Sequence, residues 1–282
     1  MRATQRDQSV TPNTGLPTFD HPPVVETVLG VQFVPLERFS SLYGGLFWQE
    51  VRSDYPAAES KPALEPVVED FGGKAITMPQ VGIQLLTEPD IRYWFIDSSS
   101  TQLIQIQRDR FIRNWRKVRT DQLYPHYDTL RPRFEHDWRR FCEFLERQHL
   151  GVPDINQCEV TYVNQIPPGA GGWEGFGAAH KVVTVLTPSE ARGYLPAPET
   201  IHLNHRYLMG QKQGRLHITL QPAIRREDAK EMLQLTLTAR GWPASSAPAD
   251  VLAWFDMGHE WIVKAFADFT TPNMHDAWGR TS

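Results

Sequence analysis

A short stretch of the chain combines positive charge with aromatic side chains. Residues 108–119 contain six arginines or lysines, opposed only by Asp109. Clustered cations bind phosphate groups, and an aromatic ring among them can stack on a base or another planar group. A binding site in this stretch would use Arg108, Arg110, Arg113, Asn114, Trp115, Arg116 and Lys117.

Two arrangements of this stretch remain open. Side chains alternate along a strand, so Phe111, Arg113, Trp115 and Lys117 would share one face and form a binding surface. Alternatively, the stretch is an edge strand whose charges face solvent and prevent aggregation, as charges commonly do on such strands. The first arrangement predicts contact with a nucleic acid, whereas the second gives the charges no binding function.

The histidines and cysteines lack the spacing of a metal site. His202 and His205 lie three residues apart, so on one strand they point to opposite faces, and His217 falls on the next strand. Zinc needs further ligands, and no cysteine or carboxylate clusters with these histidines. Cys142 and Cys158 are too few for a disulfide framework in a chain of this length. The sequence therefore predicts no metal, no cofactor and two reduced thiols in the core.

Motifs of familiar catalytic sites are absent from the sequence. The chain contains no Gly-x-Ser-x-Gly, no P-loop and no dinucleotide-binding fingerprint. The run from Gly169 to Gly172 follows two prolines and lacks a Lys-Ser/Thr pair, which is typical of a flexible loop. His259 lacks the second histidine of a zinc-protease helix, and Glu260 is placed to pair with Lys264. These features do not indicate an enzyme.

The first half of the chain has the pattern of a strand, a helix, further strands and a long helix. β-Branched and apolar residues predict a strand over 24–33, in which Glu26 either pairs with Glu159 of a later strand or faces solvent. Apolar residues three and four apart predict a helix from 39 to 51. A loop is expected over 56–73, strands at 75–78, 81–86, 93–97 and 103–117, and a long helix over 129–149.

The second half follows the same order. Strands are expected at 158–166, 202–209, 215–224 and 232–240, before a helix over 250–269. This order predicts an α+β protein with a mainly antiparallel sheet, long helices packed on one face and, if the correspondence holds, two similar halves. The expected divisions are a disordered arm over 1–18, a first half over 19–152, and a second half over 153–282 with a tail docked through Met274 and Trp278.

Composition and charge are those of a globular protein. Apolar residues make up 40% of 282 residues, which suits one large domain or two packed halves. The formal charge of −4 gives no overall attraction to nucleic acid or to an acidic membrane. No apolar run reaches the roughly 18 residues of a transmembrane helix, and the first residues lack the apolar region of a signal peptide. We therefore expect a cytoplasmic protein.

Four short sequence marks are spread from about residue 19 to residue 280. They are Pro22-Pro23-Val24 with Glu26, Phe47-Trp48, Asn114-Trp115 and the tail from Met274 to Arg280. In these marks the chain resembles a sporadically distributed, functionally uncharacterised family of bacterial proteins. The resemblance implies no catalytic residues. The patchy occurrence of the family implies an accessory component of a bacterial defence or toxin–antitoxin-type locus.

Three functions are compatible with these observations. The first is a non-catalytic binding or interaction protein with a protein partner or small ligand, which the aromatic content and the missing catalytic motifs favour. The second is a nucleic-acid-associated protein using residues 108–119, whose binding would fall steeply with salt. The third is an enzyme of unfamiliar type, with groups that converge only in the fold. No membrane partner is expected.

Overall fold

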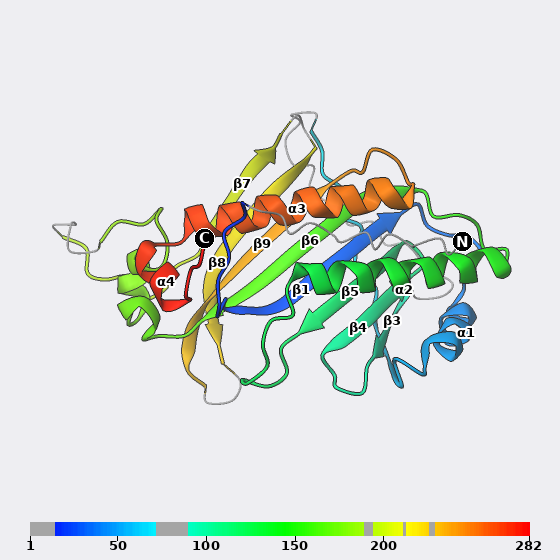
Figure 1. The fold of residues 1–282 in the computed structure, drawn as a ribbon, viewed down its shortest axis with the longest axis horizontal. Helices are drawn as coiled ribbons and strands as arrows, with labels where there is room; N and C mark the ends of the chain where they lie inside the picture. The colour runs from blue at the N-terminus through cyan, green and yellow to red at the C-terminus, as the bar shows by residue number, and fades with distance from the viewer. Residues whose placement is uncertain (1–14, 72–89, 189–193, 211–212, 226–228) are drawn as a thin grey trace, which may run out of the picture.

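The computed structural model describes residues 15–71, 90–188, 194–210, 213–225 and 229–282. Within these residues, nine strands form one antiparallel sheet in the order β2-β3-β4-β5-β1-β6-β9-β8-β7 (Figure 1). The α+β class and the antiparallel sheet are thus confirmed. The strands are β1 Val24–Phe33, β2 Ala57–Pro62, β3 Ile91–Ile96, β4 Gln102–Gln107, β5 Arg110–Arg116, β6 Ile155–Ile166, β7 Leu203–Met209, β8 Gly214–Ile224 and β9 Glu231–Gly241.

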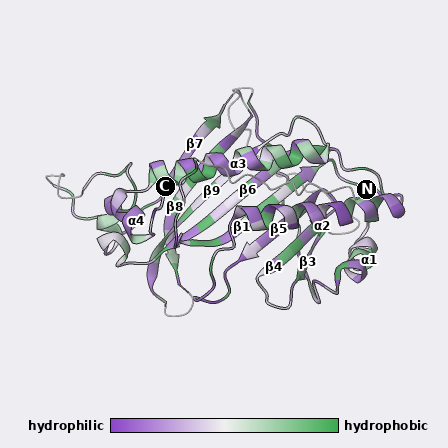
Figure 2. Cartoon of the chain, viewed as in Figure 1, coloured by the Kyte–Doolittle hydropathy of each residue, from purple (hydrophilic) through white to green (hydrophobic). Residues whose placement is uncertain are grey.

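Two helices cross the same face of the sheet (Figure 1). They are α2, Tyr127–Arg147, and α3, Pro248–Phe269. Figure 2 shows hydrophilic residues along the visible side of α2, and its apolar stripe is buried on the other side. The ring of Phe141 in this stripe lies 5.2 Å from that of Phe47 and 5.3 Å from that of Phe111. The stripe therefore joins α2 both to β5 and to the short helix α1, Ser41–Val51.

The second helix approaches the sheet closely at a glycine. An added Cβ at Gly258 of α3 would lie 3.3 Å from Val160 Cγ2 of β6 and 3.4 Å from Ala239 Cβ of β9. A side chain at this position would push the helix away from the two strands. The expected ion pair on the exposed side of α3 is confirmed, because Lys264 Nζ lies 2.5 Å from Glu260 Oε1.

Two expectations about the strands of the first half are wrong. Residues 103–117 form two strands, because the chain reverses at Arg108-Asp109 between β4 and β5. The expected loop over 56–73 begins with strand β2, which pairs with β3 at the edge of the sheet. Proline is tolerated on an edge strand, so Pro62 does not prevent this pairing. The strands expected at 75–78 and 81–86 lie outside the described residues.

The middle of the sheet joins the two halves of the chain. β1 and β6 pair antiparallel, from Val24 opposite Asn164 to Phe33 opposite Ile155. Moving outward from β1 the neighbours are β5, β4 and β3, and moving outward from β6 they are β9, β8 and β7. The expected division between residues 152 and 153 therefore falls within a single continuous sheet.

The tail packs against residues near the start of the described chain. It forms the short helix α4, Pro272–Ala277, in which Met274 is fully buried, and Trp278 directly follows with 5% of its surface exposed. The ring of Phe19 lies 5.4 Å from that of Phe266 and 6.3 Å from that of Trp278. Thr271 occupies the N-cap position, although its hydroxyl donates to the carbonyl of Lys181.

The arm expected over 1–18 lies outside the described residues as far as residue 14. Its last residues make contacts that a disordered arm would not make. The Thr18 hydroxyl lies 2.5 Å from that of Thr281, and Phe19 forms an antiparallel bridge with Arg280. These contacts tie the beginning of the described chain to the tail.

Both cysteines are free, and neither is prepared for nucleophilic chemistry. Cys158 is buried in β6, and Cys142 is partly buried in α2. Burial raises the pKa of the Cys142 thiol to about 12 and raises that of Cys158 further. A thiol with so high a pKa carries little thiolate at neutral pH.

A partly buried histidine lies between the helices and the sheet. The His259 ring of α3 stacks on the Tyr127 ring, with centroids 4.0 Å apart. Its Nδ1 lies 2.9 Å from the hydroxyl of Tyr162 on β6. Burial lowers the pKa of His259 to about 4, although the charges of Asp256 and Glu260 oppose the shift.

This histidine makes stability depend on pH. The unfolded chain binds a proton at His259 near pH 6.5, whereas the folded protein binds it only near pH 4, so stability falls as the pH drops through this window. We expect His259 to contribute roughly 2–3 kcal/mol to the loss. Urea unfolding at several pH values measures it. His259→Gln should flatten the profile, and the exposed-site control His202→Gln should leave it unchanged. Parallel profiles for all three proteins would contradict the assignment.

Candidate functional site

The sheet face opposite α2 and α3 is polar. Alternation along β5 places Phe111, Arg113 and Trp115 beneath α2, and it places Arg110 and Asn114 on the opposite side. Many of the side chains on this opposite side are buried despite their polarity. We call this side of the sheet the polar face. Its members include Gln32, Gln105, Gln107, Arg110, Asn114, Gln157, Glu159, Thr161, Arg215, His217, Thr238 and Arg240.

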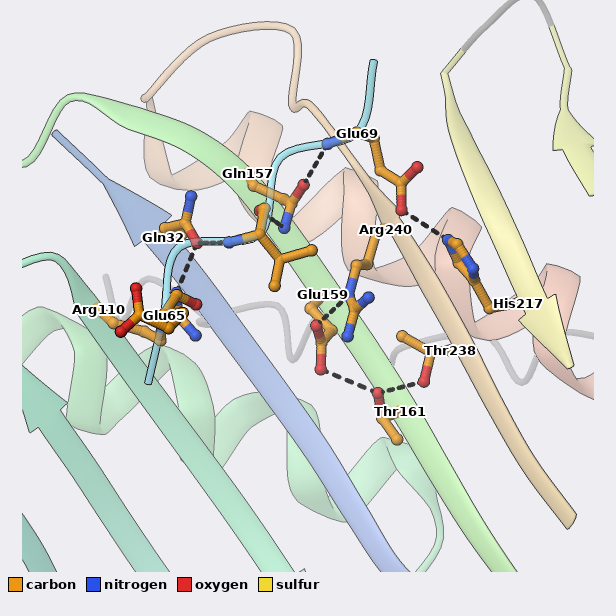
Figure 3. Close-up of polar contacts among 11 residues, drawn as sticks. Gln32, Glu65, Glu69, Arg110, Gln157, Glu159, Thr161, His217, Thr238 and Arg240 are labelled. Atoms are coloured by element: carbon orange, nitrogen blue, oxygen red, sulfur yellow. Dashed lines mark hydrogen bonds and ion pairs between the residues drawn. The ribbon is translucent and has the colours of Figure 1, made fainter. Parts of the chain in front are cut away.

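Residues 63–71 cross the polar face, and we call this segment the strap (Figure 3). Two glutamines of the sheet each bind the strap main chain at two points. Gln107 accepts a hydrogen bond from Leu64 N at 3.0 Å and donates one to Leu64 O at 3.1 Å. Gln157 accepts from Glu69 N at 3.1 Å and donates to Val67 O at 2.5 Å. These side-chain amides thus bind the strap main chain as the main chain of a neighbouring strand would, by both accepting and donating hydrogen bonds.

Further side chains of the polar face complete these main-chain contacts. Gln32 Oε1 accepts from Val67 N at 3.1 Å, and Arg110 donates to Glu65 O at 3.0 Å. Arg110 also donates to Gln32 Oε1 at 2.7 Å, which holds the two side chains together. Six main-chain groups of the strap are therefore bound by side chains of β1, β4, β5 and β6.

One strap side chain is bound as closely as the main chain. Glu69 is buried, and its carboxylate accepts from Arg215 Nη1 at 2.9 Å. The carboxylate also lies 2.6 Å from His217 Nε2 (Figure 3). Burial raises the pKa of Glu69, but the hydrogen bonds from His217 and Arg215 outweigh it, so the pKa is lowered. The carboxylate is therefore ionised at neutral pH.

The other strap side chains are partly buried or exposed. Ala63, Leu64 and Phe71 are partly buried, and the Phe71 ring lies 5.0 Å from that of Trp242. Val67 and Val68 are 40% and 59% exposed, and Glu65 and Pro66 are exposed as well. Each hydrogen bond contributes a net of about 1 kcal/mol, while ordering each residue costs about 1–2 kcal/mol. The free energy that holds the strap on the polar face is therefore small, because the gain from the hydrogen bonds is largely offset by the cost of ordering the strap residues.

Beside the strap, an ion pair occupies the centre of the polar face. Arg240 Nε lies 2.5 Å from Glu159 Oε2, and Thr161 donates to Glu159 Oε1 at 3.0 Å. The expected pairing of Glu26 with Glu159 is wrong, and Glu26 lies partly exposed on the polar face. The register places Glu26 opposite Val163, and its carboxylate accepts from Asn114. Burial raises the pKa of Glu26 despite that hydrogen bond and the charge of Arg116.

The binding residues expected from the sequence do not form one surface. β5 lies between β4 and β1, so the edge-strand interpretation is wrong. Arg113 and Trp115 do share a face, but each is only 4% exposed beneath α2. Arg110, Asn114 and Arg116 lie on the polar face instead.

The two ends of the stretch also separate. Arg108 lies in the turn before β5, and its Nε is 3.1 Å from Asp90 Oδ2. Lys117 follows β5, and its main-chain N donates to Val25 O at 2.7 Å. The residues of the basic stretch are thus divided among the turn before β5, the two faces of the sheet and the loop after β5.

An aromatic side chain that the sequence analysis did not select lies among cations on the polar face. The Trp94 ring is within 4.9 Å of Lys61 Nζ, 5.5 Å of the Arg92 guanidinium carbon and 5.8 Å of that of Arg116. These distances permit cation–π attraction. Lys61 also pairs with Glu59 at 2.7 Å.

The histidines considered as metal ligands are separated by the sheet. His205 contacts the Phe269 ring of α3, whereas His217 binds Glu69 on the polar face. Across the described ranges, no group of three or more histidine, cysteine or acidic side chains is placed to hold a metal ion. No helix in those ranges is both long and apolar enough to span a membrane.

Comparison of the chain with models of protein families, with curated proteins and with solved structures found no match. The residues of the polar face therefore provide the evidence for function. Sequence reasoning missed the glutamines, although Gln105 and Gln107 alternate with Ile104 and Ile106 along β4. That alternation was the available signal of a polar face.

Proposed function

We propose that the protein is a non-catalytic binding protein that holds an extended segment of a protein partner on its polar face. The observation that carries this proposal is the set of side-chain amides bound to the strap main chain. Such contacts recognise an extended main chain whatever its side chains are, as peptide-binding sheets do with main-chain groups. In the free protein the strap occupies the place of the partner.

The Glu69 site gives the proposal a sequence requirement. Arg215 and His217 present donors to a single buried carboxylate. Charge-assisted hydrogen bonds are stronger than neutral ones, so a partner segment with an acidic residue at this point would be preferred. The partner we propose is therefore an extended segment that carries one such glutamate or aspartate.

A peptide competition experiment tests this function. The probe is a labelled peptide with the sequence of residues 63–71, ALEPVVEDF. Glu69→Ala should loosen the strap but leave Arg215 and His217 in place, so the variant should bind the peptide roughly tenfold more tightly than the unaltered protein. Fluorescence anisotropy measures the difference.

Two controls accompany the measurement. Glu65→Ala removes an exposed strap carboxylate and should leave the affinity unchanged. A peptide in which alanine replaces the glutamate that corresponds to Glu69 should bind the Glu69→Ala protein more weakly. Equal affinities for the unaltered protein and both variants would refute the proposed function.

A nucleic acid is the second candidate ligand, and the cations around Trp94 support it. Bases stack on exposed aromatic rings, and the cations would neutralise phosphates. Arg113 and Trp115 would take no part because they are buried. Binding of a single-stranded oligonucleotide that falls steeply with salt would favour this candidate over a polypeptide.

We also propose that the chain consists of two related halves and acts in the cytoplasm as an accessory component. The mirrored strand order around β1 and β6 supports two related halves. The two free thiols agree with a cytoplasmic location. The family resemblance suggests an accessory component of a defence or toxin–antitoxin-type locus, and the partner would then be a protein encoded in the same locus.

A further inference from the structure

A second recess lies on the helix-covered side of the sheet, away from the polar face. It has a volume of about 460 Å³ and opens beside the first turns of α2. Residues from α2, from the loop after α1, from the turn after β3 and from the strands β4 and β5 line it together. The lining residues that carry the argument are Tyr55, Gln102, Arg113, Arg133, His136 and Asp137.

A buried ion pair forms part of the wall. Arg113 Nε lies 2.9 Å from Asp137 Oδ2, and each of the two residues is only 4% exposed. The hydroxyl of Tyr55 donates to the same oxygen at 2.6 Å. In the described part of the chain, no second carboxylate pairs with Arg113. Burying an ion pair is costly, and a guanidinium carries five N–H donors, of which the Nε donor binds Asp137.

A neutral side chain in the same wall lacks a partner. Gln102 is 9% exposed, and its Oε1 is buried without a hydrogen bond. Buried polar atoms almost always have a partner in folded proteins, so this oxygen indicates a donor that the chain itself does not supply. Its position in the lining of the recess allows a bound molecule to supply that donor.

The lining of the recess carries charges of both signs, and Arg133 is the described arginine in it that pairs with no carboxylate. The acidic residues are already engaged, because Asp54 pairs with Arg140 at 2.7 Å and Asp97 accepts from Ser99 and from Gln102 N. Arg133 is exposed at the rim, and none of the described carboxylates pairs with it. A carboxylate in the recess would therefore meet Arg133, which pairs with no described carboxylate, and Arg113, which already pairs with Asp137.

We propose that this recess binds a small organic acid with a hydroxyl or amino group next to its carboxylate. The carboxylate lies between Arg113 and Arg133, and the neighbouring group donates to Gln102 Oε1. Guanidinium groups bind carboxylates in this manner, and the orphan oxygen accounts for the required donor. The site is separate from the polar face, so it is independent of the proposed function.

A pair of matched probes tests both halves of the site. Lactate and propionate have the same carbon chain and carboxylate, and they differ by one hydroxyl. We expect lactate to bind roughly tenfold more tightly than propionate, because only lactate satisfies Gln102. Titration of ¹⁵N-labelled protein followed by NMR should show shifts at the Gln102 side-chain amide and at Arg113 Nε.

Two variants avoid the buried ion pair and so keep the fold intact. Gln102→Leu should reduce lactate to the affinity of propionate, and the control Gln221→Leu should not. Arg133→Ala should weaken both acids by a similar factor. Equal affinity of the unaltered protein for the two acids, binding of neither, or a lactate preference that survives Gln102→Leu would overturn the proposal. Unchanged binding in Arg133→Ala would overturn the assigned position of the carboxylate.

Discussion

Replacing Asp137 with asparagine is expected to destabilise the protein by about 3–5 kcal/mol. The substitution removes the one described carboxylate that pairs with Arg113, which is 4% exposed between α2 and the sheet. An unpaired buried guanidinium keeps its desolvation cost but loses the attraction that offsets it. The hydroxyl of Tyr55 loses a charged acceptor at the same time. Urea unfolding followed by circular dichroism measures the loss.

A double variant separates the ion pair from simple packing. Arg113→Met combined with Asp137→Leu removes both charges and retains most of the volume. We expect the double variant to be much more stable than Asp137→Asn, because no buried charge is left without a partner. If both variants lost the same free energy, packing around α2 would account for the effect. A loss below about 1 kcal/mol in Asp137→Asn would show that Arg113 is solvated through the recess.

Replacing Trp278 with alanine is expected to cost about 3–5 kcal/mol, the range found for large aromatic residues in cores. Trp278 is 5% exposed, and its ring lies 5.1 Å from Phe266 and 6.3 Å from Phe19. Truncation leaves a cavity where the tail, α3 and the start of the described chain meet. The neighbouring backbone, bridged at Phe19 and Arg280, limits how far this region can collapse.

Thermal and urea unfolding measure this effect, and an exposed aromatic residue provides the control. Tyr194→Ala should change stability by less than about 0.5 kcal/mol, because Tyr194 is 95% exposed. A similarly small change in Trp278→Ala would show that the tail adds nothing to the stability of the fold. A large loss with unchanged secondary structure would show that the tail supports tertiary packing.

Much of the architecture could be predicted because burial imposes a period on the sequence. The stripe from Leu130 to Leu145 is buried in α2, and the alternation in β8 and in most of β9 matches a sheet with one apolar face. The turn at Arg108-Asp109 was missed because it has neither glycine nor proline, the usual turn signals. Strand β2 was missed because an exposed edge strand has no apolar period.

The candidate sites were much less predictable than the fold. The basic stretch was visible as a run of charges, but a strand distributes consecutive side chains over two faces, and α2 covers one of them. The glutamines bind main-chain groups up to 90 residues away, as Gln157 and Val67 do. Side-chain amides have no sequence period that reveals such partners. Arg113 and Asp137 likewise meet only because α2 crosses β5.

The contacts between the tail and the start of the described chain have a consequence for biosynthesis. Thr18 N lies 3.1 Å from Ser282 Oγ, across 264 positions of the sequence. A ribosome makes Phe19 long before it makes Phe266 and Trp278, whose rings cover that of Phe19. Contacts of such long range form late and slow the folding of a nascent chain. A chain whose translation stops before residue 266 would leave Phe19 exposed, which is a feature that chaperones and proteases recognise.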